Sequence, residues 1–169
     1  MSQKEHYRNF NNGDAEGEVH TSWLKYINPY VQTAYEFGCG TGHNMVHLEN
    51  KGIKTFGSDL SEPATKIGID RGLHIVKEDE SILMTLRSKS FDLVYTLSVL
   101  NHIKYIDWIM EELSRITHMQ RIFIESPVIP DNAHEFWYEH DYESYGLKKM
   151  AYKWESPILK NSEYGIYIG

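Results

Sequence analysis

The sequence predicts an α/β fold built on one open sheet of seven strands, mostly parallel, with a C-terminal antiparallel hairpin and helices on both faces. Two observations favour this class. Apolar strand-like runs alternate with helical segments over residues 31–128, a pattern typical of parallel sheets with right-handed crossovers. Near the C-terminus two further runs are separated only by a short polar turn, which indicates an antiparallel hairpin.

The expected strands are runs of apolar, β-branched and aromatic residues bounded by turn residues. Five of them belong to the alternating part of the chain, and two form the closing hairpin. The five are residues 31–37, 53–60, 73–79, 91–98 and 120–128, and the two are residues 147–159 and 162–169.

Two of the three expected helices have clear local signals. Residues 43–51 and 61–71 are followed by Gly52 and Gly72, which can take the left-handed conformation that ends a helix. Ser61 has a side chain that can accept hydrogen bonds from the free amides of a first turn, and the following Glu-Pro pair also suits a helix start. The sequence therefore predicts a helix that begins directly after Ser61.

The third expected helix, residues 101–117, carries an apolar stripe. Its apolar residues recur every three or four positions, which is the spacing of one helix face. We expect this face to pack in the core and to have no chemical role. The stripe consists of Ile103, Ile106, Ile109, Met110, Leu113 and Ile116.

Length and composition indicate one globular domain, residues 1–169, whose polar start, residues 1–18, forms a flexible arm or lid. The single cysteine, Cys39, excludes an intramolecular disulfide, and the N-terminus has no apolar secretory core, so we expect a cytoplasmic protein. The chain has no run of 18 apolar residues, so no membrane span is predicted. A formal charge of −7 with scattered basic residues disfavours nucleic acid as a partner.

The stretch YEFGCGTGHN, residues 35–44, places three glycines after the first expected strand. Glycine allows positive φ and close approach of a ligand to the backbone, at the sheet edge where open α/β folds bind ligands. A dinucleotide fingerprint would need glycine at position 43, which is His43, and the loop has no Gly-Lys-Ser/Thr of a phosphate loop. Asp59, at the end of the second expected strand, can accept hydrogen bonds from two ribose hydroxyls.

The segments EFGCGTG, GSDLS and SFDLVYTLSVLNHI, in this order, closely resemble class I S-adenosylmethionine-dependent methyltransferases, which have a Rossmann-like fold. The resemblance covers about residues 31–169, including the closing strand pair. It implies that S-adenosylmethionine is the cofactor and that a methyl group is transferred. A nicotinamide-dependent oxidoreductase is disfavoured by the loop spacing.

The resemblance also implies a role for each matching residue. Glu36 and the backbone of Gly38 and Gly40 would hold the methionine end of the cofactor. Asp59 would bind the ribose hydroxyls, and Leu60 would pack on the adenine. Asp79 would bind the adenine amino group, with Glu78 as the alternative because the family pattern there is Gly-Asp. Thr96 and Leu97 would lie under the methionine moiety, and His102 matches a histidine common in the family.

The acceptor is expected to be a small molecule. Methylases that act on bases of nucleic acids and resemble this fold have an Asn/Asp-Pro-Pro-aromatic segment after the fourth strand, whereas this chain has Thr96-Leu97-Ser98-Val99. His102 is the expected general base, should the acceptor have to lose a proton. Tyr7 is expected in the wall of the pocket, and the aromatic residues near Trp137 are expected above it.

Three further expectations concern metal binding, the oligomeric state and an alternative function. His134 and His140 are six residues apart and would point away from each other on one helix, so no metal site is predicted. The chain is expected to be a monomer or homodimer. An S-adenosylmethionine-binding sensor or a non-catalytic subunit remains the alternative to an enzyme.

Overall fold

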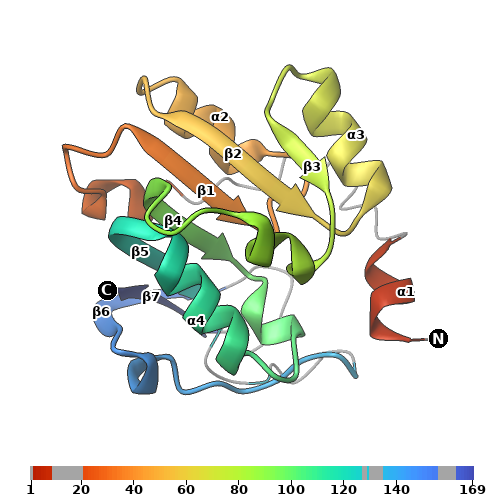
Figure 1. Ribbon diagram of the computed structural model, residues 1–169. Helices are drawn as coiled ribbons and strands as arrows, with labels where there is room; N and C mark the ends of the chain where they lie inside the picture. Colours follow the sequence, from red (N-terminus) through yellow and green to blue (C-terminus); the bar gives the residue numbers. More distant parts are fainter. Residues whose placement is uncertain (1, 9–20, 127–128, 130–134, 156–162) are drawn as a thin grey trace.

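The computed structural model describes residues 2–8, 21–126, 129, 135–155 and 163–169, and contains one seven-stranded sheet (Figure 1). The strand order is β3-β2-β1-β4-β5-β7-β6. Neighbours from β3 to β5 pair in parallel, and β7 runs antiparallel between β5 and β6. The strands are β1 (Thr33–Phe37), β2 (Lys54–Asp59), β3 (Ile75–Lys77), β4 (Phe91–Leu97), β5 (Thr117–Glu125), β6 (Lys148–Glu155) and β7 (Glu163–Ile168). The predicted fold class is confirmed.

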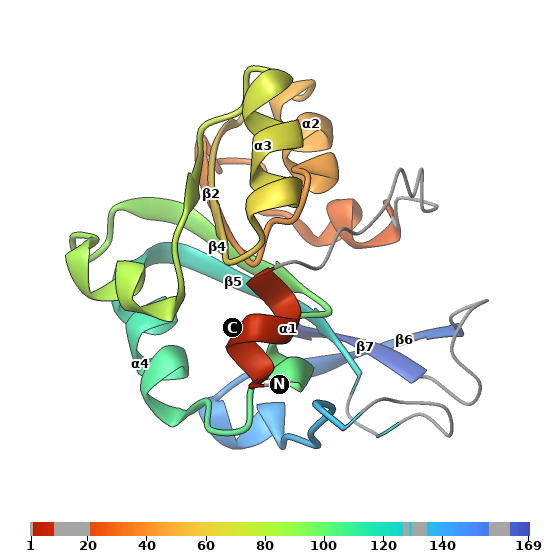
Figure 2. The same cartoon turned by 90° about the vertical axis from the view of Figure 1, so that its right-hand side faces the viewer.

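Helices cover both faces of the sheet. Figure 2 shows α2 and α3 on one side and α4 on the other. The α-helices are α1 (Gln3–Arg8), α2 (His43–Glu49), α3 (Glu62–Asp70) and α4 (Asp107–Ile116), and the 3-10 helices are η1 (Ser22–Tyr26), η2 (Glu80–Thr85), η3 (Leu100–His102) and η4 (Tyr142–Tyr145).

Alternating residues of the central strands fill the two cores. Tyr35 of β1 and Val94 of β4 pack with the buried side of α4, whereas Ala34 and Leu93 pack with Leu48 of α2. Because side chains of a strand point alternately to opposite faces, β1 and β4 are buried on both sides, as central parallel strands usually are. Because β1 to β5 pair in parallel, their carboxyl ends lie at the same edge of the sheet.

The start of α3 follows the prediction. The hydroxyl oxygen of Ser61 accepts a hydrogen bond from the Ala64 N–H at 3.3 Å, which satisfies one free donor of the first turn. Gly72, just beyond the helix, has a φ of +86° and donates its N–H to the Ile69 carbonyl. Local sequence signals therefore set both ends of this helix.

The third predicted helix is shorter than expected. It begins at Asp107 and not at residue 101, because the chain first forms η3 and then becomes extended at Ile103, with a φ of −118° and a ψ of 122°. The expected apolar stripe is otherwise present, with Ile109, Met110 and Leu113 buried. His102 thus belongs to a separate turn between β4 and α4.

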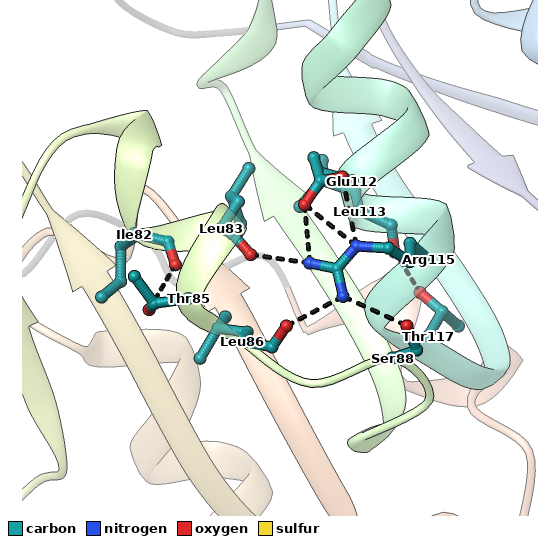
Figure 3. A network of polar contacts seen from close by, with 9 residues as sticks. All are labelled: Ile82, Leu83, Thr85, Leu86, Ser88, Glu112, Leu113, Arg115 and Thr117. Atoms are coloured by element: carbon teal, nitrogen blue, oxygen red, sulfur yellow. Dashed lines mark hydrogen bonds and ion pairs between the residues drawn. The ribbon is translucent and has the colours of Figure 1, made fainter.

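The crossover from β3 to β4 contains the 3-10 helix η2 in place of an α-helix, and Arg115 of α4 holds it (Figure 3). The Arg115 guanidinium donates to the carbonyls of Leu83 at 2.9 Å and Leu86 at 2.8 Å. It also pairs with Glu112 of the same helix at 2.6 Å. A single arginine therefore bonds one carbonyl of η2, which also accepts from the Leu86 N–H, and one carbonyl just beyond it.

Helix α1 lies at the carboxyl edge of the sheet. In Figure 1 it is beyond the arrowhead of β2, and in Figure 2, which looks toward that edge, it lies in front of the sheet. The Lys4 ammonium is 2.8 Å from a carboxylate oxygen of each of Asp79 and Glu80. Residues 9–18 of the expected arm lie outside the described residues. Within the described part of the chain, no helix has the length and apolar character needed to cross a membrane.

Candidate functional site

The glycine loop connects β1 to α2 and contacts both neighbouring strand ends. Gly38, Gly40 and Gly42 have φ values of +73°, +53° and +77°, which L residues with side chains rarely adopt. The N–H groups of Gly38 and Cys39 donate to the Ser58 carbonyl of β2 at 2.8 and 3.0 Å. A Cβ atom added to Gly38 would lie 2.6 Å from Val99 Cγ1. The loop needs glycine both for its dihedral angles and for the close approach of Val99.

Asp59 ends β2, and its carboxylate faces the glycine loop. One oxygen accepts from the Gly40 N–H at 2.8 Å, and the other accepts from the Ser61 N–H at 2.7 Å. Burial raises the pKa of Asp59, and the backbone hydrogen bonds oppose that shift. Each carboxylate oxygen can accept more than one hydrogen bond, so both keep capacity for the hydroxyls of a ligand.

Glu36 is buried one residue before the end of β1. Its oxygens accept from the Asn44 amide at 2.8 Å and from the Tyr95 hydroxyl at 3.0 Å. Burial raises the pKa of Glu36 to about 8, with a contribution from the nearby Asp59 charge. Neither Glu36 nor Asp59 has a cationic partner within 4.0 Å among the described residues. Two acidic side chains thus lie close together near the carboxyl ends of β1 and β2.

The other residues expected around the cofactor differ in accessibility. Leu60 and Leu97 are half-buried and lie at the ends of β2 and β4. Thr96 is fully buried, and its hydroxyl donates to a Glu125 carboxylate oxygen at 2.7 Å. The Thr96 side chain is therefore committed to a contact in the interior between β4 and β5.

Asp79 has a structural role in addition to its expected one. One oxygen accepts from the Ser81 N–H at 3.0 Å and caps η2, and the other pairs with Lys4 at 2.8 Å. These hydrogen bonds hold the pKa of Asp79 well below its usual range. Glu78, the alternative, is exposed, and its N–H donates to the Asp59 carbonyl at 3.1 Å. Both candidates thus follow β3 on the side of the site where α1 lies.

His102 lies among aromatic rings. Its ring centroid is 5.3 Å from that of Tyr7 and 4.7 Å from that of Trp137, which it meets edge-on. Its Nδ1 is 3.3 Å from the Phe136 carbonyl oxygen. In the tautomer with the proton on Nδ1 this contact is a hydrogen bond, and Nε2 carries the lone pair that a base needs. The structure thus brings together Tyr7, expected in the pocket wall, Trp137, expected above the pocket, and His102, the expected base.

Glu125, at the end of β5, is a site residue that sequence reasoning missed. It is completely buried, and it accepts from the Thr96 hydroxyl and from the N–H of Val99 at 3.0 and 3.1 Å. Burial raises its pKa to about 7. The signal was present in the sequence, because an acidic residue directly follows the apolar run IFI within the expected strand 120–128.

One further polar residue in this region, Asn101, was also missed, whereas Tyr142 was expected among the aromatic residues above the pocket. The Asn101 amide and the Tyr142 hydroxyl are buried, and neither has a hydrogen-bond partner among the described residues. An unsatisfied buried polar group costs about 1–3 kcal/mol, so such groups usually bind water or a ligand. The Asn101 carbonyl accepts from the Tyr138 N–H at 2.7 Å, which places the segment that begins at Glu135 against η3.

No group of three or more metal-binding side chains lies together within the described ranges. His134, one of the two histidines considered for metal binding, falls outside them. The other, His140, has Nε2 at 3.1 Å from the Leu100 carbonyl and 2.9 Å from the Ile103 carbonyl. His140 therefore contacts the turn between β4 and α4.

Comparison with known proteins identifies the class. A family model described as a methyltransferase domain matches residues 35–124, which is more than half of the chain, so the chain belongs to this family. The expected class I S-adenosylmethionine-dependent methyltransferase family is confirmed. Comparison with curated proteins gives no significant match.

Solved structures with the same fold agree. A SAM-dependent methyltransferase from Archaeoglobus fulgidus has a TM-score of 0.66 and 16% identity, over 86% of this chain and 90% of its own. One from Methanosarcina mazei has a TM-score of 0.68 and 14% identity, over 87% and 95%. Phosphoethanolamine N-methyltransferase 2 of Haemonchus contortus, solved with S-adenosyl-L-methionine, has a TM-score of 0.62 and 18% identity, over 73% of this chain and 35% of its own.

The residues at the carboxyl edge fit this class and its cofactor. S-adenosylmethionine carries a sulfonium, an ammonium, a carboxylate and two ribose hydroxyls. Asp59 has acceptor capacity for the ribose hydroxyls, and Glu36, whose pKa burial raises to about 8, offers a negative charge to a nearby ammonium when it releases its proton. The left-handed glycines allow close approach of the ligand to the backbone.

Proposed function

We propose that the protein transfers the methyl group of S-adenosylmethionine to a small, polar acceptor molecule. The observation that carries the cofactor assignment is the pair of acidic side chains, Glu36 and Asp59, near the ends of β1 and β2, with no cationic side chain within 4.0 Å of either in the described part of the chain. In this proposal the Asp59 carboxylate binds the ribose hydroxyls, and Glu36 faces the ammonium. Gly38 and Gly40 line the path of the methionine moiety, with Leu97 beneath it.

Catalysis would rest mainly on positioning. A sulfonium already activates the methyl group that it carries, so the protein must align donor and acceptor and exclude water. Orientation in a dry site can lower a barrier by about 7–11 kcal/mol in favourable cases. His102 would act as general base only for an acceptor that must lose a proton before attack, with Nε2 receiving that proton.

Two buried groups support a polar acceptor. The Asn101 amide offers a donor and an acceptor, and the Tyr142 hydroxyl offers one of each, yet neither has a partner among the described residues. Both are shielded from solvent, so entry of an acceptor would require the residues that cover them to move. A hydroxylated or carboxylated metabolite would satisfy these atoms. A formal charge of −7 also favours such a molecule over nucleic acid.

The assignment of Asp59 is tested by calorimetry with S-adenosylhomocysteine, the product of the donor. Asp59→Ala is expected to abolish measurable binding, because two hydrogen bonds to a charged acceptor are lost. His102→Ala is the matched control and is expected to bind with the wild-type affinity. Unchanged affinity of the Asp59 variant would contradict the proposed cofactor site.

Transfer itself is tested separately from binding. Incubation with methyl-labelled donor and a panel of hydroxylated and carboxylated metabolites should give a labelled small molecule. Binding of the donor without incorporation into any metabolite, protein or nucleic acid would favour a sensor or a non-catalytic subunit. We further propose that residues 1–169 act as one domain in a monomer or homodimer.

A further inference from the structure

The geometry points to Glu125 as a positioning residue, whose ionised carboxylate caps η3 and thereby fixes the turn, residues 98–102, beside the proposed cofactor site. This inference rests on the proposed function, which identifies the site beside the turn as the cofactor site. It concerns a residue of β5, the strand next to the one that leads into the turn.

The turn cannot cap itself. The residue at the N-cap position of η3 is Val99, whose side chain has no hydrogen-bonding atom, and no side-chain cap is formed. The free N–H groups of a helical start must nevertheless find acceptors when they are buried. The Glu125 carboxylate supplies them, since it accepts from the N–H of Val99 at 3.0 Å and of Asn101 at 3.4 Å.

The same carboxylate connects the turn to β4. The Thr96 hydroxyl donates to it at 2.7 Å, so donors from both sides of Ser98 converge on one group. Ser98 has a φ of +55°, a conformation that costs a residue with a side chain roughly 1 kcal/mol. Such a conformation persists only where surrounding contacts hold it, and Ser98 Oγ is also 2.9 Å from the Tyr164 hydroxyl of β7.

The position of the turn affects the proposed site because the turn carries two residues beside it, Val99 and His102. Val99 packs against the bare Cα of Gly38 in the glycine loop, and His102 ends η3. Displacement of the Val99 backbone would therefore move the wall of the methionine site and His102 together. Glu125 acts through these residues and has no contact with the reacting atoms in this arrangement.

Ionisation of Glu125 strengthens the cap, because a carboxylate accepts stronger hydrogen bonds from N–H groups than a carboxylic acid does. Burial raises its pKa to about 7. The titratable groups around it are Tyr142 of η4, Tyr164 and Tyr167 of β7, and His140, which contacts the far side of the turn. Burial raises the pKa of each of these tyrosines and lowers that of His140, so Glu125 is the group among them whose pKa lies closest to 7.

The test is amide hydrogen exchange of the ligand-free protein, resolved by residue. Glu125→Gln keeps the size of the side chain and removes its charge, and the amides of Val99 and Asn101 should exchange about tenfold faster. The matched control is Glu49→Gln, since Glu49 also accepts a threonine hydroxyl, from Thr55 at 2.7 Å, but lies at the end of α2. That variant should leave the two amides unchanged.

The wild-type protein provides a second readout that does not depend on folding of a variant. After correction for the intrinsic rate, protection of the Val99 and Asn101 amides should rise between pH 6.5 and 8.5 and should be flat in the Glu125 variant. Constant protection in the wild type, or wild-type protection in Glu125→Gln, would overturn the inference. The measurement needs no ligand, so failure of the proposed function would leave its outcome unchanged.

Discussion

Replacement of Gly38 by alanine should destabilise the protein through backbone strain and through contact with Val99. The φ of +73° costs an L residue about 1–2 kcal/mol. The added Cβ would lie 2.6 Å from Val99 Cγ1, and relief of such overpacking typically costs a further 1–3 kcal/mol or so. We expect Gly38→Ala to lower the free energy of unfolding by about 2–5 kcal/mol, measured by urea denaturation.

Gly52 provides the matched control. Its φ is +82°, but nothing lies within 4 Å of an added Cβ, so Gly52→Ala should show only the conformational cost of about 1–2 kcal/mol. Val99→Ala should also rescue part of the loss in Gly38→Ala, which a double-mutant cycle measures as a favourable coupling. Equal losses for the two glycine variants, with no coupling to Val99, would refute the contact between the glycine loop and the turn after β4.

Three further predictions concern other parts of the site and its supports. Burial raises the pKa of Glu36 to about 8, so the folded state keeps a proton that the unfolded chain releases. The free energy of unfolding, measured by urea denaturation at a series of pH values, should therefore fall as the pH rises toward 8. The fall should be smaller in Glu36→Gln. Ser61→Ala should cost about 1 kcal/mol through loss of the α3 cap, in the same assay. Arg115→Met should release η2, seen as faster amide exchange over residues 80–88, whereas unchanged exchange would show that the network in Figure 3 is dispensable.

The parts of the structure that the sequence predicts well are those set by neighbours in the chain. Ser61 before Glu-Pro defines the start of α3, and the left-handed Gly72 lies at its end. The glycine loop follows β1 directly, and Asp59 ends β2, so parallel pairing of two predicted strands is enough to bring them together. Both sides of the proposed cofactor site could therefore be predicted without any knowledge of distant contacts.

The parts that the sequence did not predict depend on distant contacts. The apolar stripe near residue 103 has helical spacing, yet the chain forms a separate turn there, which accepts a hydrogen-bond partner from a distant strand: the Glu125 carboxylate, 24 residues after Asn101, bonds the Asn101 N–H of η3. The pairing of Lys4 with Asp79 joins residues 75 positions apart. No local pattern encodes which acceptor a distant strand will present, so such contacts become visible only in the folded chain.

A crystal structure of the protein with S-adenosylhomocysteine tests the central claim most directly. The account predicts that the ligand lies across the carboxyl end of β1, with both ribose hydroxyls about 3 Å from the Asp59 carboxylate and its ammonium facing Glu36. A ligand bound elsewhere, or an Asp59 carboxylate turned away from the ribose, would contradict it.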